Sequence, residues 1–313
     1  MSRRRSVRAD EVALLASLPQ PGPTAPIDPD RGSLYTADEL YDTIGQHHSR
    51  YRDSLDARAY AWSKQPHDRS AARVRALHDF SIDEALDTWI AGRRIVGIMG
   101  GHQTLRGDEN YRRTAELAHR LSNHATIATG GGPGAMEAGN LGASYGGYPS
   151  TDLDHAILEL ARVPTYEPSI SRWVRSALAV RAPDARDTLG IPTWHYGDEP
   201  PNAFATAIAK YFKNAQREAI LLNICNAGIV FLPGAAGTVQ EIFQDACENY
   251  YALPDRVAPM ILLGADYWTN TLPVWPALRA LTTFDVSGRA ATRPMAAQTH
   301  LANSIDEVVE LLS

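Results

Sequence analysis

Residues 130–137 of the chain read GGGPGAME, and residues 233–241 read PGAAGTVQE. Each stretch follows a short apolar run, at 125–129 and 229–232, with the composition of a buried strand. Each is followed by residues that favour a helix. A glycine turn between a strand and a helix aims free backbone N–H groups at one point, where the helix dipole favours an anion. The two stretches therefore predict a phosphate-bearing ligand at the carboxyl edge of a parallel sheet.

Strand and helix signals alternate along the chain. Strands are predicted at 94–99, 125–129, 156–160, 228–232 and 259–263, and helices at 36–62, 81–91, 108–122, 135–145, 201–224, 238–250, 267–281 and 304–312. This alternation predicts an α/β fold, a doubly wound Rossmann-like parallel sheet with helices on both faces. Residues 1–91 are predicted to form an N-terminal extension, irregular to residue 35 and then helical. Residues 92–313 are the predicted nucleotide-binding domain, with an insertion at about 150–200.

The composition is that of a globular protein. The 313 residues are 44% hydrophobic and 21% charged, with a net charge of −6. The acidic balance argues against a nucleic-acid partner. Cys225 and Cys247 are too few for a disulfide framework, which favours the cytoplasm, and Cys247 is expected in the core. No stretch approaches about 18 uninterrupted apolar residues, so neither a membrane span nor a membrane partner is expected.

Other nucleotide and cofactor sites fit the sequence poorly. Residues 97–102 read GIMGGH and lack the G-x-G-x-x-G spacing of dinucleotide-binding folds, as do residues 130–134. No Walker loop is present. The histidines show no metal-ligand spacing, and Lys64, Lys210 and Lys213 lie outside the glycine stretches, where a pyridoxal phosphate would need a lysine. The sequence therefore predicts no metal and no cofactor.

Both glycine stretches, in this order, resemble the paired motifs GGGPGxMEAAN and PGGxGTxxE of the LONELY GUY family. Residues 95–102 (IVGIMGGH) and Tyr111 are similar to that family's first glycine turn and downstream tyrosine. The resemblance covers about residues 92–285. It implies a homodimeric phosphoribohydrolase, which cleaves the N-glycosidic bond of a nucleoside 5′-monophosphate to free base and ribose 5-phosphate. The implied ligand is AMP or N6-modified AMP, the latter as in cytokinin biosynthesis.

The resemblance also assigns the site residues. The family's catalytic glutamate and arginine fall on Glu241 and Arg217. The implied substrate- and phosphate-binding residues are Gly100, Gly101, Gly131, Gly132, Gly134, Met136, Glu137, Pro233, Gly234, Gly237 and Thr238. The residue types suit the chemistry, because a carboxylate stabilises positive charge developing on the sugar and a guanidinium binds a phosphate through two hydrogen bonds.

The same residues also have plainer interpretations. Thr238-x-x-Glu241 fits a helix capping box. Arg217 fits a solvated ion-pair partner on a helix. Glu137 fits an acidic residue that stabilises the first turn of a helix. Each of these alternatives stays open at the level of the sequence.

Two departures from the family pattern favour a second function. Ala235 stands where the family has glycine, and a left-handed backbone there would strain the alanine by about 1 kcal/mol. Glu218 follows Arg217 where the family often has lysine. The alternative is a non-catalytic nucleotide-binding or sensing protein of the same fold. Residues 194–196 (WHY) fit either a base-stacking group or a buried aromatic cluster.

Overall fold

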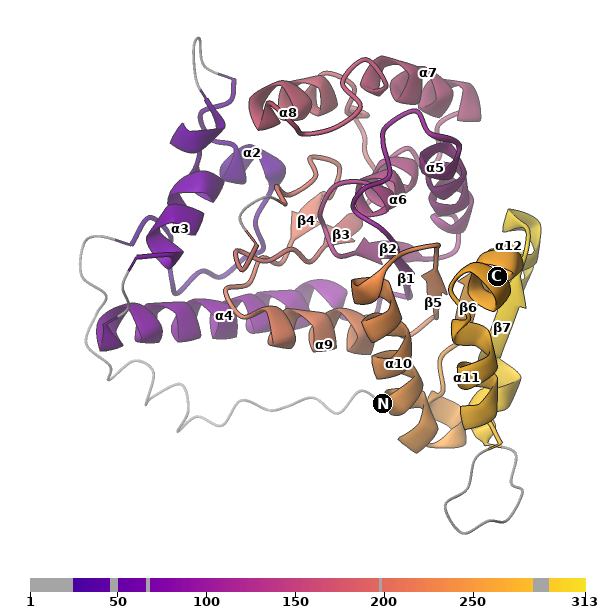
Figure 1. Cartoon of the computed structure of the whole chain (residues 1–313). Coiled ribbons are helices and arrows are strands. Elements are labelled where there is room, and N and C mark those ends of the chain that lie inside the picture. Colours follow the sequence, from indigo (N-terminus) through magenta and orange to yellow (C-terminus); the bar gives the residue numbers. More distant parts are fainter. Residues whose placement is uncertain (1–24, 46–49, 66–67, 197–198, 284–292) are drawn as a thin grey trace.

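The computed structural model describes residues 25–45, 50–65, 68–196, 199–283 and 293–313. Its centre is a seven-stranded sheet in the order β4-β3-β2-β1-β5-β6-β7, in which every neighbouring pair is parallel (Figure 1). The strands are β1 (Ile95–Met99), β2 (Thr126–Thr129), β3 (Thr188–Gly190), β4 (Ala207–Ile208), β5 (Ile229–Phe231), β6 (Met260–Leu263) and β7 (Thr299–Ala302). The predicted α/β fold class is confirmed.

Helices cover both faces of this sheet. They are α2 (Ala37–Leu40), α3 (Leu55–Ser63), α4 (Arg69–Ile90), α5 (Glu109–Leu121), α6 (Ala135–Ser144), α7 (Ser150–Leu160), α8 (Ile170–Leu178), α9 (Asn214–Ile224), α10 (Ala236–Tyr251), α11 (Val274–Leu281) and α12 (Ile305–Leu312). Single turns lie at Tyr51–Asp53, Pro254–Arg256, Tyr267–Thr271 and Pro294–Gln298. Within the described ranges, no helix is long and apolar enough to cross a membrane.

The period-two geometry of a strand divides the core into two layers. In β1, Val96 and Ile98 pack in one apolar cluster with residues of α5 and α12. Ile95 and Met99 point to the other face, where residues of α4, α9, α10 and α11 pack. Every residue of β1 is buried, as expected for a central parallel strand covered on both sides.

The strands that contain long apolar runs lie close to their predicted positions, and one predicted strand is wrong. Residues 156–160 form the second half of the helix α7. The buried residues of α7 are Leu153, Ala156, Ile157 and Leu160, and this spacing is that of one helix face. The segment predicted as an insertion builds α7 and α8 and also contributes β3, the second strand from one edge of the sheet.

Two predicted helices begin at other residues. The helix expected at 81–91 begins twelve residues earlier, at Arg69, and Asp68 caps it by accepting from the Ala71 N–H. Ser81 therefore lies inside α4 and donates to the Pro29 carbonyl. The helix expected at 201–224 begins only at Asn214, because the preceding residues form β4 and irregular backbone.

The N-terminal region is attached to the sheet by buried polar contacts. Tyr35 and Ile208 exchange two backbone hydrogen bonds, which adds an antiparallel bridge beside β4. Asp56 of α3 accepts from Lys210 Nζ at 2.5 Å and from Trp194 Nε1 at 2.8 Å. Trp194 also stacks on Phe212, so this tryptophan belongs to a buried aromatic cluster. The predicted irregular start, residues 1–35, lies mostly outside the described residues. The helix predicted at 36–62 is wrong as one continuous helix, because α2 ends at Leu40 and α3 begins only at Leu55, with residues 46–49 outside the described residues.

Candidate functional site at the carboxyl edge of the sheet

The first glycine stretch forms a tight turn between β2 and α6. Gly131 and Gly134 have φ values of 73° and 70°, a left-handed backbone that favours glycine. A Cβ on Gly134 would lie 2.6 Å from the carbonyl oxygens of Gly101 and His102. A Cβ on Gly132 would lie 2.9 Å from Met136 Cε, so Met136 packs over this turn. The run of glycines is therefore required by close packing inside the chain.

The two glycine stretches meet at the turn that follows β1. The Gly101 carbonyl accepts from the Ala135 N–H at 3.1 Å, on the side of the first stretch. On the other side, a Cβ on Gly101 would lie 3.9 Å from the Pro233 carbonyl oxygen and 4.0 Å from Gly234 Cα. Gly100 is packed between Ala135 and Leu232. The structure thus brings together the glycine turns of β1, β2 and β5 at one edge of the sheet.

Two buried asparagines hold the first glycine turn in place. Asn140 Oδ1 accepts from Thr129 Oγ1 and from Asn202 Nδ2. Asn202 also donates its side-chain Nδ2 to the Gly132 carbonyl and its backbone N–H to the Gly131 carbonyl. The role of Asn202 was missed from the sequence because its segment was predicted to be helical. In the sequence, the only local feature that marks Asn202 is its position directly after two prolines.

The second glycine stretch leads directly into α10. Ala235 is the N-cap residue with φ −102°, so it needs no left-handed backbone, and the expected strain is absent. Its methyl group makes no cap hydrogen bond. Because the helix begins at Ala236, Thr238 lies in the first turn and the capping-box interpretation is wrong. The first N–H groups of α10 therefore have no acceptor on the N-cap side chain. Such free N–H groups at a helix start can donate to a bound anion.

Side chains on both sides hold the second stretch. Tyr267 donates its hydroxyl to the Gly234 carbonyl at 2.8 Å. Thr238 packs its side chain against Gly234, close to where a Cβ would lie. A Cβ on Gly237, by contrast, would meet no atom within 4 Å. Open space therefore faces the first turn of α10 at Gly237.

Arg217 reaches from α9 to the first glycine turn. Its Nε donates to the Ile191 carbonyl at 2.6 Å, and one terminal nitrogen donates to the Gly130 carbonyl at 3.1 Å. Among the described residues, no carboxylate lies within ion-pair distance of this guanidinium. Two carbonyl contacts fix its orientation and leave further N–H donors for a ligand.

Glu241 lies on α10, one turn beyond Thr238, within electrostatic range of Arg217. The pKa of its carboxyl is raised to about 7, because burial and the charge of Glu218 raise it by more than the Arg217 charge lowers it. A carboxyl with such a pKa exchanges protons near neutral pH, as general acid–base chemistry requires. The structure thus places Glu241 and Arg217 in one electrostatic neighbourhood.

Glu137 forms a buried ion pair with Arg106. Its two carboxylate oxygens accept from Arg106 Nε at 2.8 Å and from a terminal nitrogen of Arg106 at 2.5 Å. Tyr111 also donates to it at 3.1 Å. Both charged side chains are only 1% exposed. Arg106 stacks over the Trp173 ring and donates to its carbonyl, which connects α6 to α8.

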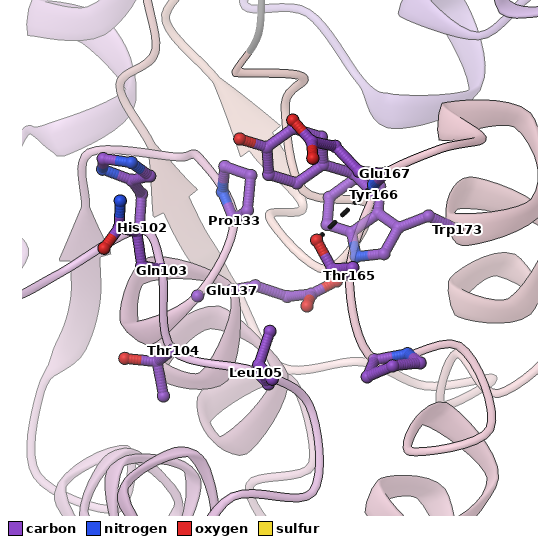
Figure 2. Close-up of a pocket in the computed structure, with 12 residues that line it drawn as sticks. His102, Gln103, Thr104, Leu105, Pro133, Glu137, Thr165, Tyr166, Glu167 and Trp173 are labelled. Carbon is purple, nitrogen blue, oxygen red and sulfur yellow. Dashed lines mark hydrogen bonds between the residues drawn. The ribbon is translucent and has the colours of Figure 1, made fainter.

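A pocket of about 300 Å³ opens beside the first glycine turn. Figure 2 shows Glu137 near the centre of the lining, with its side chain directed toward Trp173 and with His102 and Pro133 to its upper left. The lining residues are His102, Gln103, Thr104, Leu105, Pro133, Gly134, Glu137, Pro164, Thr165, Tyr166, Glu167 and Trp173. Gly134 and Glu137 line this pocket, whereas Glu241 and Arg217 do not.

A second acid lies one turn beyond Glu241. Asp245 is buried, and its Oδ2 has no hydrogen-bond partner among the described residues. Burial, together with the charge of Glu248, raises the pKa of its carboxyl to about 8. Folded Asp245 thus keeps a proton that the unfolded chain releases, so its contribution to stability is lost as the pH rises toward 8. We expect the unfolding free energy to fall by up to about 2 kcal/mol more between pH 6 and pH 8 in the parent than in Asp245→Asn.

Urea unfolding at several pH values measures this difference. Glu116→Gln changes an exposed carboxyl on α5, away from Asp245, and serves as the control, whose pH dependence should stay close to that of the parent. An equal pH dependence in the parent and Asp245→Asn would contradict the raised pKa.

The remaining candidate groups lie apart from this edge. In the part of the chain that the structure describes, no group of three or more His, Cys, Asp or Glu side chains could hold a metal ion. Cys225 is buried, but Cys247 is exposed, so the expectation of a core position for Cys247 is wrong. The buried face of the second half of α10 is formed by Ile242, Asp245, Ala246 and Asn249, and Cys247 lies off this face.

Comparisons with known proteins give remote similarities only. No protein-family model and no curated protein matches this sequence. The structure is similar to that of the molybdenum cofactor binding protein from the phototrophic bacterium Rippkaea orientalis, with 15% identity over 71% of this chain and 96% of that protein and a TM-score of 0.44. The structural-genomics target TM1055 gives 17% identity, 70% and 97% coverage and a TM-score of 0.43. The molybdenum cofactor carrier protein from Chlamydomonas reinhardtii is 16% identical, with coverage of 70% of this chain and 98% of that protein, and the TM-score is 0.39. At these values the similarities identify no ligand and no activity for this chain.

Proposed function

We propose that this protein hydrolyses the N-glycosidic bond of a nucleoside 5′-monophosphate to a free base and ribose 5-phosphate. The observation that supports the proposal best is the meeting of three glycine turns at one edge of the sheet, where Arg217 is bonded to the Gly130 carbonyl and Glu241 lies on the helix that follows the third turn. Such an edge offers backbone N–H groups for a phosphate and an acid for the sugar. By resemblance to the LONELY GUY motifs, we take AMP or N6-modified AMP as the ligand.

In this proposal the 5′-phosphate binds at the start of α10. The uncapped N–H groups of the first turn donate to the phosphate oxygens, and Gly237 leaves space for their approach. Arg217 has N–H donors beyond those bound to the Ile191 and Gly130 carbonyls, and these extend toward the same ligand.

Glu241 then acts on the sugar. Positive charge develops at the anomeric carbon as the bond to the base breaks, and a carboxylate stabilises that charge or removes a proton from the attacking water. The water oxygen bonds to the anomeric carbon, and one of its protons ends on the departing base. A pKa of about 7 lets Glu241 accept and release this proton near neutral pH.

The open space at Gly237 yields a test of the phosphate position. In Gly237→Ala the new methyl group meets no protein atom, and alanine favours a helix over glycine by about 1 kcal/mol, so stability should be kept or raised. If the phosphate approaches this N–H, the methyl group displaces it and the Kd for AMP rises by about tenfold or more. Calorimetric titration and thermal unfolding measure the two effects. Gly32→Ala, whose Cβ also meets nothing, is the matched control.

The activity itself is tested with a panel of nucleoside 5′-monophosphates. Free base is followed by chromatography and ribose 5-phosphate by mass spectrometry, with the corresponding nucleosides as substrates that lack the phosphate. We expect release of base from a monophosphate and much less from its nucleoside. Binding of a monophosphate with no base released from any member of the panel would reject the proposal.

A second candidate is a non-catalytic nucleotide-binding or sensing protein. The observation that favours it is the pocket of about 300 Å³, whose lining contains neither Glu241 nor Arg217. A ligand there would be bound without contact to the proposed acid. Leu105→Trp would fill this pocket and should abolish nucleotide binding if the ligand lies there. The alternative would be established by that loss, together with unchanged nucleotide affinity in Glu241→Ala and no release of base by the parent.

We further propose that the protein forms a homodimer, as the resemblance implies. The exposed Tyr251 and Leu253, 79% and 62% accessible, are apolar surface at the end of α10 that a second copy could cover. Sedimentation of the parent and of Tyr251→Lys measures the oligomeric state, and a parent that is monomeric at all concentrations would reject the dimer.

A further inference from the structure

The start of α9 takes its cap from a different helix. Lys213, the N-cap residue, makes no side-chain cap hydrogen bond. Instead, the carboxylate of Asp79 on α4 accepts from the backbone N–H of Phe212 at 3.0 Å and of Lys213 at 3.1 Å. A carboxylate at this end of a helix also interacts favourably with the helix dipole. Asp79 of α4 thus provides the capping acceptor that the residues directly before α9 do not provide.

Asp79 is itself held by a buried chain of hydrogen bonds. His78 Nδ1 lies 3.1 Å from Asp79 Oδ1, and His78 Nε2 lies 2.8 Å from the Tyr35 hydroxyl. Burial lowers the pKa of His78, so the ring is neutral. With Asp79 as an acceptor, Nδ1 carries the proton and Nε2 accepts from Tyr35. The carboxylate therefore has a fixed orientation when it meets the start of α9.

Asp83 makes a second attachment one turn further along α4. It accepts from the Tyr211 hydroxyl at 2.8 Å and from Gln216 Nε2 at 2.9 Å. Gln216 directly precedes Arg217. Figure 1 shows the end of α4 beside α9. The two acids, spaced four residues apart on one face of α4, thus contact backbone or side chains from Tyr211 to Gln216.

We propose that α4, through Asp79 and Asp83, is a positioning element for Arg217. The two carboxylates fix the first turn of α9, and this turn directs the Arg217 guanidinium to the Ile191 and Gly130 carbonyls at the glycine edge. The functional part of this inference rests on the proposed role of Arg217. In this proposal α4 supports the candidate site indirectly, because its acids position Arg217 and do not themselves bind the ligand.

The test compares Asp83→Ala with Asp83→Asn, which keeps an acceptor for Tyr211 or Gln216. Asp87→Asn, an exposed acid one turn further along α4, is the control. Amide hydrogen exchange reports α9 whether or not the protein is an enzyme. We expect exchange at residues 217–220, the first amides of α9 that have an acceptor within the helix, to rise about tenfold or more in Asp83→Ala, less in Asp83→Asn and not in the control, with global unfolding little changed. Unchanged exchange in Asp83→Ala would overturn the proposal.

A double-mutant cycle separates positioning from general stability. Asp83→Ala should lower kcat/KM for the monophosphate about tenfold, because small misplacements of a substrate-binding group have effects of that size. It should have no further effect in the Arg217→Ala background, and Asp83→Asn should restore part of the loss. Additive losses in the two backgrounds would overturn the positioning role. If the parent releases no base, the hydrolase proposal fails. The positioning role of α4 can still be tested, by the same double-mutant cycle measured on the Kd for AMP and by the hydrogen-exchange data.

Discussion

Replacing Glu241 with glutamine is expected to lower kcat for hydrolysis of the monophosphate by about 100-fold or more. The amide keeps the size of the side chain but neither carries negative charge nor accepts the proton of a water. Because burial raises the Glu241 pKa to about 7, removing the ionisable group should relieve destabilisation at alkaline pH, so the variant should fold at least as well as the parent at pH 8. Steady-state kinetics and thermal unfolding at that pH separate the two effects.

Glu248→Gln makes the same chemical change at an exposed position two turns further along the same helix. It should leave kcat within about twofold of the parent, because exposed substitutions away from a site have small effects. AMP affinity in Glu241→Gln should stay within about threefold, since in the proposed mechanism the phosphate is bound by the start of α10 and by Arg217. Full activity in Glu241→Gln would remove this residue from the mechanism.

Arg106→Met should lower the free energy of unfolding by about 3–5 kcal/mol. The substitution removes every donor that Arg106 provides to Glu137 and leaves a carboxylate that is 1% exposed without its counter-charge. The methionine keeps much of the apolar contact with Trp173. Urea unfolding monitored by circular dichroism gives the magnitude.

Two further variants show whether the loss comes from the uncompensated charge. Arg112→Met breaks the exposed pair with Asp154 and should lower stability by less than about 1 kcal/mol. Arg106→Met combined with Glu137→Gln removes both charges and should recover a large part of the loss. An effect of Arg106→Met as small as that of Arg112→Met would show that the buried pair contributes little.

The sequence predicts the centre of the fold better than its periphery. The apolar runs of β1, β2, β5 and β6 are typical of strands buried on both faces, and each leads into a turn and a helix. β4 has only two residues, and β3 reads TLG, without the apolar run that marks β5. Both are strands because neighbouring strands pair with them, which is a tertiary effect that local sequence does not contain.

The errors in the helices have a similar origin. Residues 156–160 are apolar enough for a strand, and only the positions of Leu153 and the residues before it reveal the helical period. The start of α4 was misplaced because Ser81 and Glu84 have the spacing of a capping box. In the folded chain Ser81 is used for a tertiary bond to Pro29, and the actual cap is Asp68.

For the candidate site, the sequence predicts which turns meet but not what supports them. Glycine turns after parallel strands must lie at one edge, so their proximity follows from the fold class. Asn202, Tyr267 and Asp79 support these turns or α9 from segments distant in sequence. No short motif marks such residues, because their partners are backbone groups that become neighbours only in the folded chain.

The bridge between Tyr35 and Ile208 also bears on how the protein tolerates truncation. β4 is the outermost strand on its side, and Tyr35 satisfies both the N–H and the C=O of Ile208. A chain shortened beyond Tyr35 would leave these groups open on an apolar strand, a template on which other copies can add strands and aggregate. The N-terminal segment thus protects the molecule against self-association at this border as well as completing its core.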